Sequence, residues 1–214
     1  MRKPELLTGL LTEVAVAKSS KTGEVDPRKL GSQPLTQSMH AEILRYYIAI
    51  LTLRHGETGP VSFGGYVLQK TDIVLIYSRT GALDEKAWSR SGRATGSLEQ
   101  FDAERFLINH DSHLCKEAAK GCENENIGQR QFSMAGLAGI WLPFGGGDRM
   151  CPGRHYAKTE MIITLALLFN KFDVELQMAD TSKVQPNMGF APFGSLPPTC
   201  ALPFRIRRKI ALSS

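Results

Sequence analysis

The pattern of apolar positions along the chain predicts three helices. Residues 5–19, 35–51 and 153–172 each place apolar side chains at helical spacing. The second segment follows Pro34, and Thr36 or Ser38 is its candidate capping residue. Its predicted buried stripe consists of Leu35, Met39, Ile43 and Tyr46. Residues 21–34, with their Gly, Asp and Pro, are typical of a loop between the first two helices.

Other segments favour strands and irregular structure. Residues 62–68 (SFGGYVL) hold a Gly-Gly turn between two apolar runs, and residues 71–78 (TDIVLIYS) are rich in β-branched side chains, so a small sheet is expected. Residues 107–140 show little periodicity and predict a long irregular meander. The last forty residues are typical of strands and turns and end in an edge-like FRIRRK. The expected class is mainly α with small β-sheets (α+β).

Composition narrows the class of protein. The chain has 214 residues and 42% hydrophobic residues, enough for one folded domain. Its net charge of +5 is spread along the sequence, which predicts a solvated surface and no nucleic-acid binding. Pro4, Glu5 and Glu13 interrupt the apolar stretch that a secretion signal needs, so an intracellular, reducing location is expected for the four cysteines. The apolar run 161–169 is too short to cross a bilayer.

The segment with the most informative chemistry is residues 143–157 (PFGGGDRMCPGRHYA). Gly145, Gly146 and Gly147 allow the backbone to approach a flat ligand closely. Cys151 then precedes a predicted helix, whose N-terminal amides and dipole favour the thiolate form of a cysteine. The segment therefore predicts a cysteine that binds a metal, rather than a buried structural cysteine.

This segment resembles the cysteine loop of the cytochrome P-450 family. Phe144, Gly147, Cys151 and Gly153 match the signature F-x-x-G-x-x-x-C-x-G, and Ala157 occupies a further family position. The resemblance implies a haem b whose iron takes the Cys151 thiolate as axial ligand. It also implies that Phe144 shields the sulfur from water and that Arg149 meets a haem propionate.

Two further elements follow the family order. Glu42 and Arg45 stand three positions apart in E-I-L-R, and Arg105 lies in F-D-A-E-R-F, where Ala103 replaces the family's proline. The resemblance joins these residues in a Glu-Arg-Arg triad that fixes the meander to the helix, whereas the bare spacing of Glu42 and Arg45 fits a surface ion pair equally well. Arg54 falls where the family places a second propionate-binding residue, although an exposed strand arginine would look the same.

The resemblance also suggests a substrate class. Residues 48–53 and 193–198 correspond to substrate-lining segments and are apolar enough to face a lipophilic molecule, although core packing would explain them too. CPGRHYAKTEM and LPPTCALPFRIRRK resemble fungal members, in the neighbourhood of the cholesterol 7α-hydroxylase and prostacyclin synthase branch. The implied activity inserts one oxygen atom from O2 into a lipophilic small molecule of fungal secondary or sterol-like metabolism. Electrons would come from NADPH through a flavoprotein reductase at the endoplasmic reticulum membrane.

Several family elements are not found in the chain. It has no A/G-G-x-x-T segment, no W-x-x-x-R helix and no membrane anchor. We therefore expect residues 1–214 to form a single partial domain, the truncated C-terminal part of the family fold, with the motifs in residues 34–210 and no hydroxylation by the chain unaided. A catalytically inactive remnant or a haem-binding fragment is the alternative. A third reading is a zinc module built from His110, His113, Cys115 and Cys122.

Overall fold

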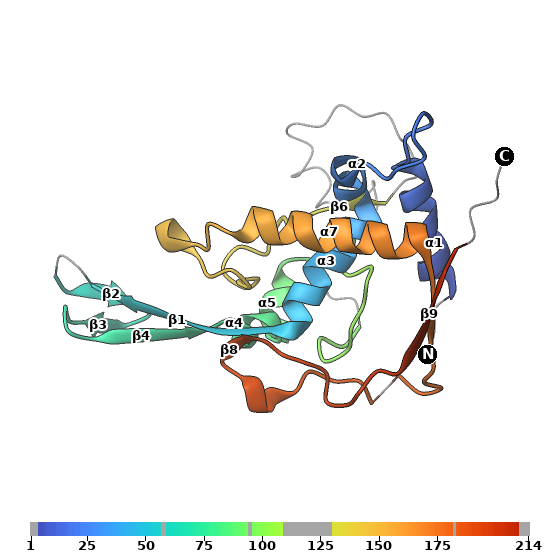
Figure 1. Cartoon of the computed structure of the whole chain (residues 1–214). Coiled ribbons are helices and arrows are strands. Elements are labelled where there is room, and N and C mark those ends of the chain that lie inside the picture. Colours follow the sequence, from blue (N-terminus) through green and yellow to red (C-terminus); the bar gives the residue numbers. More distant parts are fainter. Residues whose placement is uncertain (1–3, 57–58, 94–95, 109–129, 182, 210–214) are drawn as a thin grey trace.

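The computed structural model describes residues 4–56, 59–93, 96–108, 130–181 and 183–209 (Figure 1). Its longer helices pack together on one side of the molecule, and a narrow arm of strands extends away from them. The helices are α1 (Pro4–Val16), α2 (Pro27–Ser32), α3 (Pro34–Tyr47), α4 (Ser78–Ala82), α5 (Glu85–Arg90) and α7 (Arg154–Lys171), with 3-10 turns η1 (Gly147–Arg149) and η2 (Met188–Phe190).

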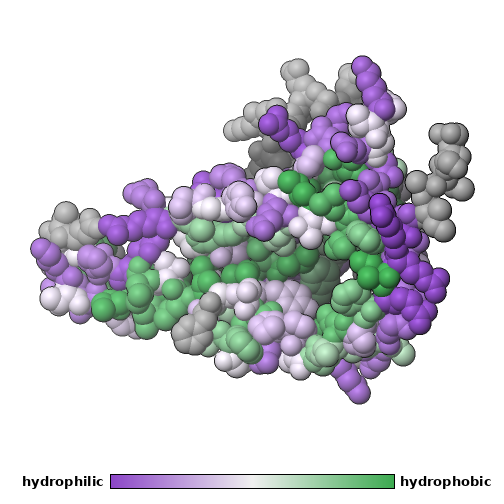
Figure 2. Space-filling model, viewed as in Figure 1, coloured by the Kyte–Doolittle hydropathy of each residue, from purple (hydrophilic) through white to green (hydrophobic). Residues whose placement is uncertain are grey.

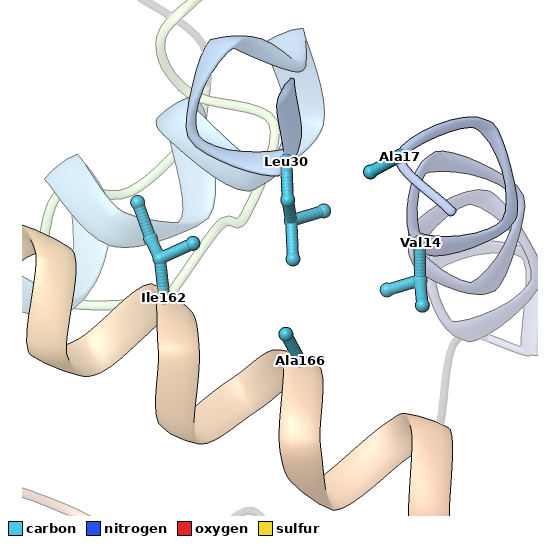
Figure 3. Packing of buried hydrophobic residues seen from close by; sticks show 5 residues of the cluster. All are labelled: Val14, Ala17, Leu30, Ile162 and Ala166. Atoms are coloured by element: carbon cyan, nitrogen blue, oxygen red, sulfur yellow. The ribbon is translucent and has the colours of Figure 1, made fainter. Parts of the chain in front are cut away.

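A first apolar cluster joins α1, α2 and α7. Leu30 on α2 is fully buried, and Figure 3 shows its side chain pointing between those of α1 and α7. Its neighbours in the cluster are Val14, Ala17, Ile162 and Ala166. Because the partners come from both ends of the chain, burial of this cluster fixes α7 against the N-terminal helices.

The strands form small antiparallel sheets. One sheet has the order β4–β1–β8, and three strand pairs complete the set: β2 with β3, β5 with β6, and β7 with β9. Gly64 and Gly65 join β2 to β3 with left-handed φ angles of 57° and 84°, as a tight hairpin turn requires. The strands are β1 (Ile48–His55), β2 (Val61–Phe63), β3 (Tyr66–Leu68), β4 (Ile73–Tyr77), β5 (Leu107–Ile108), β6 (Gln131–Phe132), β7 (Phe172–Leu176), β8 (Phe193–Ser195) and β9 (Phe204–Arg208).

The arm formed by β1 to β4 exposes apolar side chains. Figure 2 shows them along the arm and across the centre of the same face. On the arm, the most exposed large apolar residues are Leu53, Phe63, Tyr66, Val67 and Ile73. No helix in the described part of the chain is both long and apolar enough to pass through a bilayer.

A second apolar cluster lies under the loops. Ala41 of α3 packs with Trp88, Leu98, Phe106 and Leu137, and all five are buried. The rings of Trp88 and Phe106 meet edge to face at a centroid distance of 5.9 Å. This cluster holds the segments on either side of residues 109–129 against α3.

Three predictions from the sequence are wrong in detail. Neither Thr36 nor Ser38 caps the second helix, because α3 begins at Pro34 with Gln33 as N-cap. Residues 21–34 are not all loop, since α2 forms there with Pro27 at the first turn and with Asp26 as N-cap, whose side chain accepts from the backbone N–H groups of Arg28 and Lys29. The second helix does not reach residue 51. It ends at Tyr47 because Ile48 adopts extended angles (φ −109°, ψ 128°) and begins β1, which pairs with β8.

Candidate functional site

A buried ion cluster connects α3 to the segment before β5. Glu42 is fully buried, and its carboxylate accepts hydrogen bonds from Arg45 Nε at 2.6 Å and Arg45 Nη2 at 2.7 Å. Arg105 Nε donates to the same carboxylate at 3.1 and 3.2 Å, and the backbone N–H of Asp102 does so at 2.8 Å. The structure therefore brings together the three residues Glu42, Arg45 and Arg105, with both guanidinium groups on one carboxylate.

Backbone carbonyl groups satisfy the remaining donors of this cluster. Arg45 donates to the carbonyl oxygens of residues 82, 98 and 100, and Arg105 donates to those of residues 97 and 100. Ser38 Oγ accepts from the backbone N–H of Phe106 at 3.1 Å. Burying three charges costs desolvation energy, which such a full set of hydrogen bonds offsets. The cluster thus fixes residues 97–106 to one face of α3.

The cysteine loop is a tight turn that presents Cys151 at the surface. The backbone N–H of Cys151 donates to the carbonyl oxygen of Phe144 at 3.0 Å, which closes the loop. Gly145 and Gly147 have φ angles of +76° and +68°, in the left-handed region that favours glycine. The Cys151 side chain is exposed. A side chain at Gly153, whose backbone is right-handed, would begin 3.8 Å from Cys151 Sγ.

Strand β1 holds the middle of this loop. Arg54, half-buried on β1, donates through Nη2 to the carbonyl oxygen of Gly146 at 2.5 Å and through Nη1 to that of Leu53 at 2.7 Å. Thr52 lies on the same strand close to Gly145. Arg149 is exposed in η1, two residues before Cys151. Two basic side chains therefore come from the cysteine loop itself and from the strand that holds it.

These residues fit a haem bound by its iron to Cys151. The sulfur is at the surface, at the end of the loop. The hydrogen bond that closes this loop fixes the backbone of Cys151. Phe144, near the start of the loop, is half-buried, and Arg54 and Arg149 carry the positive charge that propionate groups require. One exposed cysteine thiol is the ligand type that a thiolate haem site requires.

The two predicted substrate-lining segments lie side by side. Ile48, Ala49 and Ile50 of β1 pair with Ser195, Gly194 and Phe193 of β8, respectively. In the first segment, Ala49 is fully buried, whereas Leu51 and Leu53 are exposed on the arm. In the second, Leu196 is buried. Part of each segment therefore belongs to the core, and the exposed part of β1 leads away from it.

The four residues of the proposed zinc module, His110, His113, Cys115 and Cys122, lie outside the described residues. Within the described ranges, no group of three or more His, Cys, Asp or Glu side chains is arranged to hold a metal ion.

A cavity of about 530 Å³ lies behind the cysteine loop and has no counterpart in the sequence analysis. It is a partly open pocket bordered by α3, by residues 132–147 and by the start of α7, and its lining includes His40, Trp141, Arg154, His155 and Lys158. Within the described part of the chain, Nε2 of His40 is buried without a hydrogen-bond partner. Burial, and then the charge of Lys158, lowers the pKa of His40 from 6.5 to about 4.

The depressed pKa of His40 predicts a loss of stability in mild acid. The unfolded chain binds a proton at this residue near pH 6.5 and the folded chain only near pH 4, so the contribution of His40 is present above pH 6.5 and lost as pH falls to 4. Because solvent reaches part of the ring, we expect a loss of about 2 kcal/mol. Urea unfolding at pH 7.5 and 4.5 should show this loss in the wild type.

His40→Gln should remove this part of the pH dependence. The control His155→Gln, at an exposed residue in the first turn of α7, should retain it. If His40→Gln lost as much unfolding free energy between pH 7.5 and pH 4.5 as the wild type does, His40 would not be the source of the pH dependence.

Comparison with known proteins finds a family model and relatives that match this chain. The family model described as Cytochrome P-450 matches residues 1–200, which includes α1 and α2 ahead of the sequence motifs. Cytochrome P-450 monooxygenase fsoE of Humicola fuscoatra is 34% identical, over 100% of this chain and 38% of the relative. Cytochrome P-450 monooxygenase efuG of Hormonema carpetanum is 33% identical, over 84% of this chain and 32% of the relative. Cytochrome P-450 monooxygenase calL of Penicillium decumbens is 36% identical, over 81% of this chain and 29% of the relative. The chain thus spans about a third of the length of these relatives.

Proposed function

The chain belongs to the cytochrome P-450 family, and we propose that it is the cysteine-loop part of a haem-thiolate monooxygenase. The predicted family and the predicted mixture of helices and small sheets are confirmed. The whole protein would insert one oxygen atom from O2 into a lipophilic small molecule. The observation that carries the proposal is the exposed Cys151 sulfur at the end of a closed, glycine-rich loop.

In this proposal the loop residues and two arginines divide the binding of haem among them. Cys151 holds the haem iron, and haem supplies the one-electron and O2 chemistry when it is bound. Phe144 covers the loop side of the sulfur and excludes water from it. Arg54 and Arg149 pair with the propionates, and Arg54 also holds the loop through the Gly146 carbonyl.

The ion cluster has a supporting role. Glu42 holds Arg45 and Arg105, and these residues fix the segment around residues 97–106 onto α3. The same helix packs against the loops that precede the cysteine loop. The cluster would therefore keep the site in shape without contact with substrate.

The substrate and partners are inferred from the relatives and from the chemistry. The named relatives are fungal monooxygenases, so we infer an oxidation in fungal secondary or sterol-like metabolism. A haem monooxygenase needs electrons from outside, and we propose NADPH as their source through a flavoprotein reductase. Members of the family are commonly membrane-associated, and we propose the endoplasmic reticulum membrane as the location of the whole protein.

One spectrum tests the proposal. Haem-reconstituted protein, reduced and exposed to carbon monoxide, should show the strongly red-shifted Soret band of a thiolate-ligated haem. Cys151→Ala should lose this band completely because no thiolate remains. Cys200→Ala, at a half-buried cysteine, is the matched control and should keep it. A red-shifted band that survives in Cys151→Ala would overturn the assignment.

A further inference from the structure

Trp141 connects the helix of the ion cluster to the start of the cysteine loop. Its indole Nε1 donates to the carbonyl oxygen of Ala41 at 3.1 Å, across 100 positions of sequence. Ala41 is buried in α3 and directly precedes Glu42. The turn of α3 that carries the buried carboxylate is therefore also the turn that Trp141 binds.

The Trp141 ring also contacts the loop itself. It meets the Phe144 ring edge to face, with centroids 6.5 Å apart and planes at 73°, and it meets Phe106 in the same way at 6.4 Å. The backbone carbonyl of Phe144 is the acceptor for the Cys151 N–H. A continuous series of contacts thus runs from Ala41 through Trp141 and Phe144 to the backbone of Cys151.

We propose that Trp141 is a positioning residue for Cys151. The loop from residue 142 to 151 contains three consecutive glycines, which leave its backbone much conformational freedom. Arg54 holds the middle of the loop through Gly146, and Trp141 holds its beginning against α3. Both anchors together define where the sulfur lies. The role of Cys151 as iron ligand rests on the proposed function, whereas the fixing of the loop by Trp141 does not.

The variant Trp141→Phe removes the indole donor and keeps an aromatic ring. The Ala41 carbonyl lies inside α3 and belongs to the helical hydrogen-bond ladder, so the variant does not strand it without a donor. The matched control is Trp88→Phe. Trp88 also donates from Nε1 to a backbone carbonyl, that of Gly81 at 3.0 Å, and belongs to the same apolar cluster. It is not in the series of contacts that leads to Cys151.

Hydrogen exchange of the loop amides provides the first measurement and needs no haem. In Trp141→Phe, exchange in the peptide that spans residues 142–153 should become about fivefold faster, which corresponds to about 1 kcal/mol. The bonds that report it are those from the N–H groups of Gly145, Met150 and Cys151. Trp88→Phe should leave this peptide unchanged. Equal exchange in the wild type and Trp141→Phe, or equal acceleration in both variants, would overturn the proposal.

The absorption spectrum of the reduced, haem-loaded protein with carbon monoxide bound provides the second measurement. The fraction of haem in the red-shifted band should fall at least twofold in Trp141→Phe and stay at the wild-type value in Trp88→Phe, because a loop that moves holds the thiolate on iron less well. If the wild type itself lacks the band, the proposed function fails, and hydrogen exchange alone then decides whether Trp141 fixes the loop. If the wild type has the band and Trp141→Phe matches it, positioning of the sulfur by Trp141 is wrong.

Discussion

Glu42→Gln is expected to lower the free energy of unfolding by about 3–5 kcal/mol, because it leaves two buried guanidinium groups without a counter-charge. Glu42 is fully buried and accepts from Arg45, Arg105 and the N–H of Asp102. Glutamine has nearly the same shape, so the loss measures charge rather than volume. Urea unfolding monitored by circular dichroism at pH 7 gives the difference in unfolding free energy between the wild type and Glu42→Gln.

A surface pair of the same residue types supplies the control. Glu104 pairs with Arg130 at 2.5 Å, with 30% and 53% of the two side chains exposed. Because solvent screens this pair, Glu104→Gln should cost less than about 1 kcal/mol. Similar losses in Glu42→Gln and Glu104→Gln would show that the buried cluster does not hold the fold together.

Leu30→Ala is expected to cost about 3 kcal/mol of unfolding free energy. The Leu30 side chain has no exposed surface and lies between residues of α1 and α7 (Figure 3). Alanine would remove its contacts with both helices and leave a cavity, since neither neighbour can move far without unpacking the other. The same urea titration measures the loss.

Leu167→Ala on α7 tests whether burial is the cause. Leu167 is 48% exposed, so its truncation should cost no more than about 1 kcal/mol. If both truncations had the same small effect, the α1–α2–α7 cluster would not be a core.

The cysteine loop was accessible to sequence reasoning because it is encoded by residue types at fixed short spacing, whereas the complete ion cluster followed only from the resemblance to the family. Phe144, Gly147 and Cys151 stand within one turn, and Gly147, which the signature requires, has a left-handed φ angle, as does Gly145 two positions before it. Glu42 and Arg45 lie one helical turn apart, and Arg105 follows within a second motif. Local spacing is preserved on folding, so the cysteine loop can be predicted without knowledge of the tertiary structure. Arg105 lies 63 positions beyond Glu42, and its place on the Glu42 carboxylate was implied only by the family resemblance.

Periodicity misjudged α3 for a physical reason. The predicted apolar stripe included Met39 and Ile43, which are only half-buried, whereas the fully buried positions include Ser38, Glu42 and Arg45. A hydrophobic pattern cannot identify a helix face whose burial depends on an ion cluster rather than on apolar contacts. The end of the helix was missed because the apolar run continues past Tyr47, and only pairing with β8 makes Ile48 extended.

The environments of His40 and Trp141 could not be predicted at all. The pKa of His40 is lowered by burial and then by the charge of Lys158, which lies more than a hundred positions away. The acceptor for Trp141, a helical carbonyl, carries no sequence signal. Such contacts depend on which elements meet in space, and no motif records them.

Glycine serves two separate purposes in the cysteine loop. Gly145 and Gly147 are needed for their backbone angles, and any other residue there would be strained. Gly153 has φ −74° and ψ −2°, which every residue adopts easily, yet a methyl group on it would touch Cys151 Sγ at 3.8 Å. At this position a side chain would fold without difficulty and would narrow the approach to the sulfur. Selection for glycine at residue 153 would thus act on chemistry at the thiol, while selection at residues 145 and 147 would act on the shape of the chain.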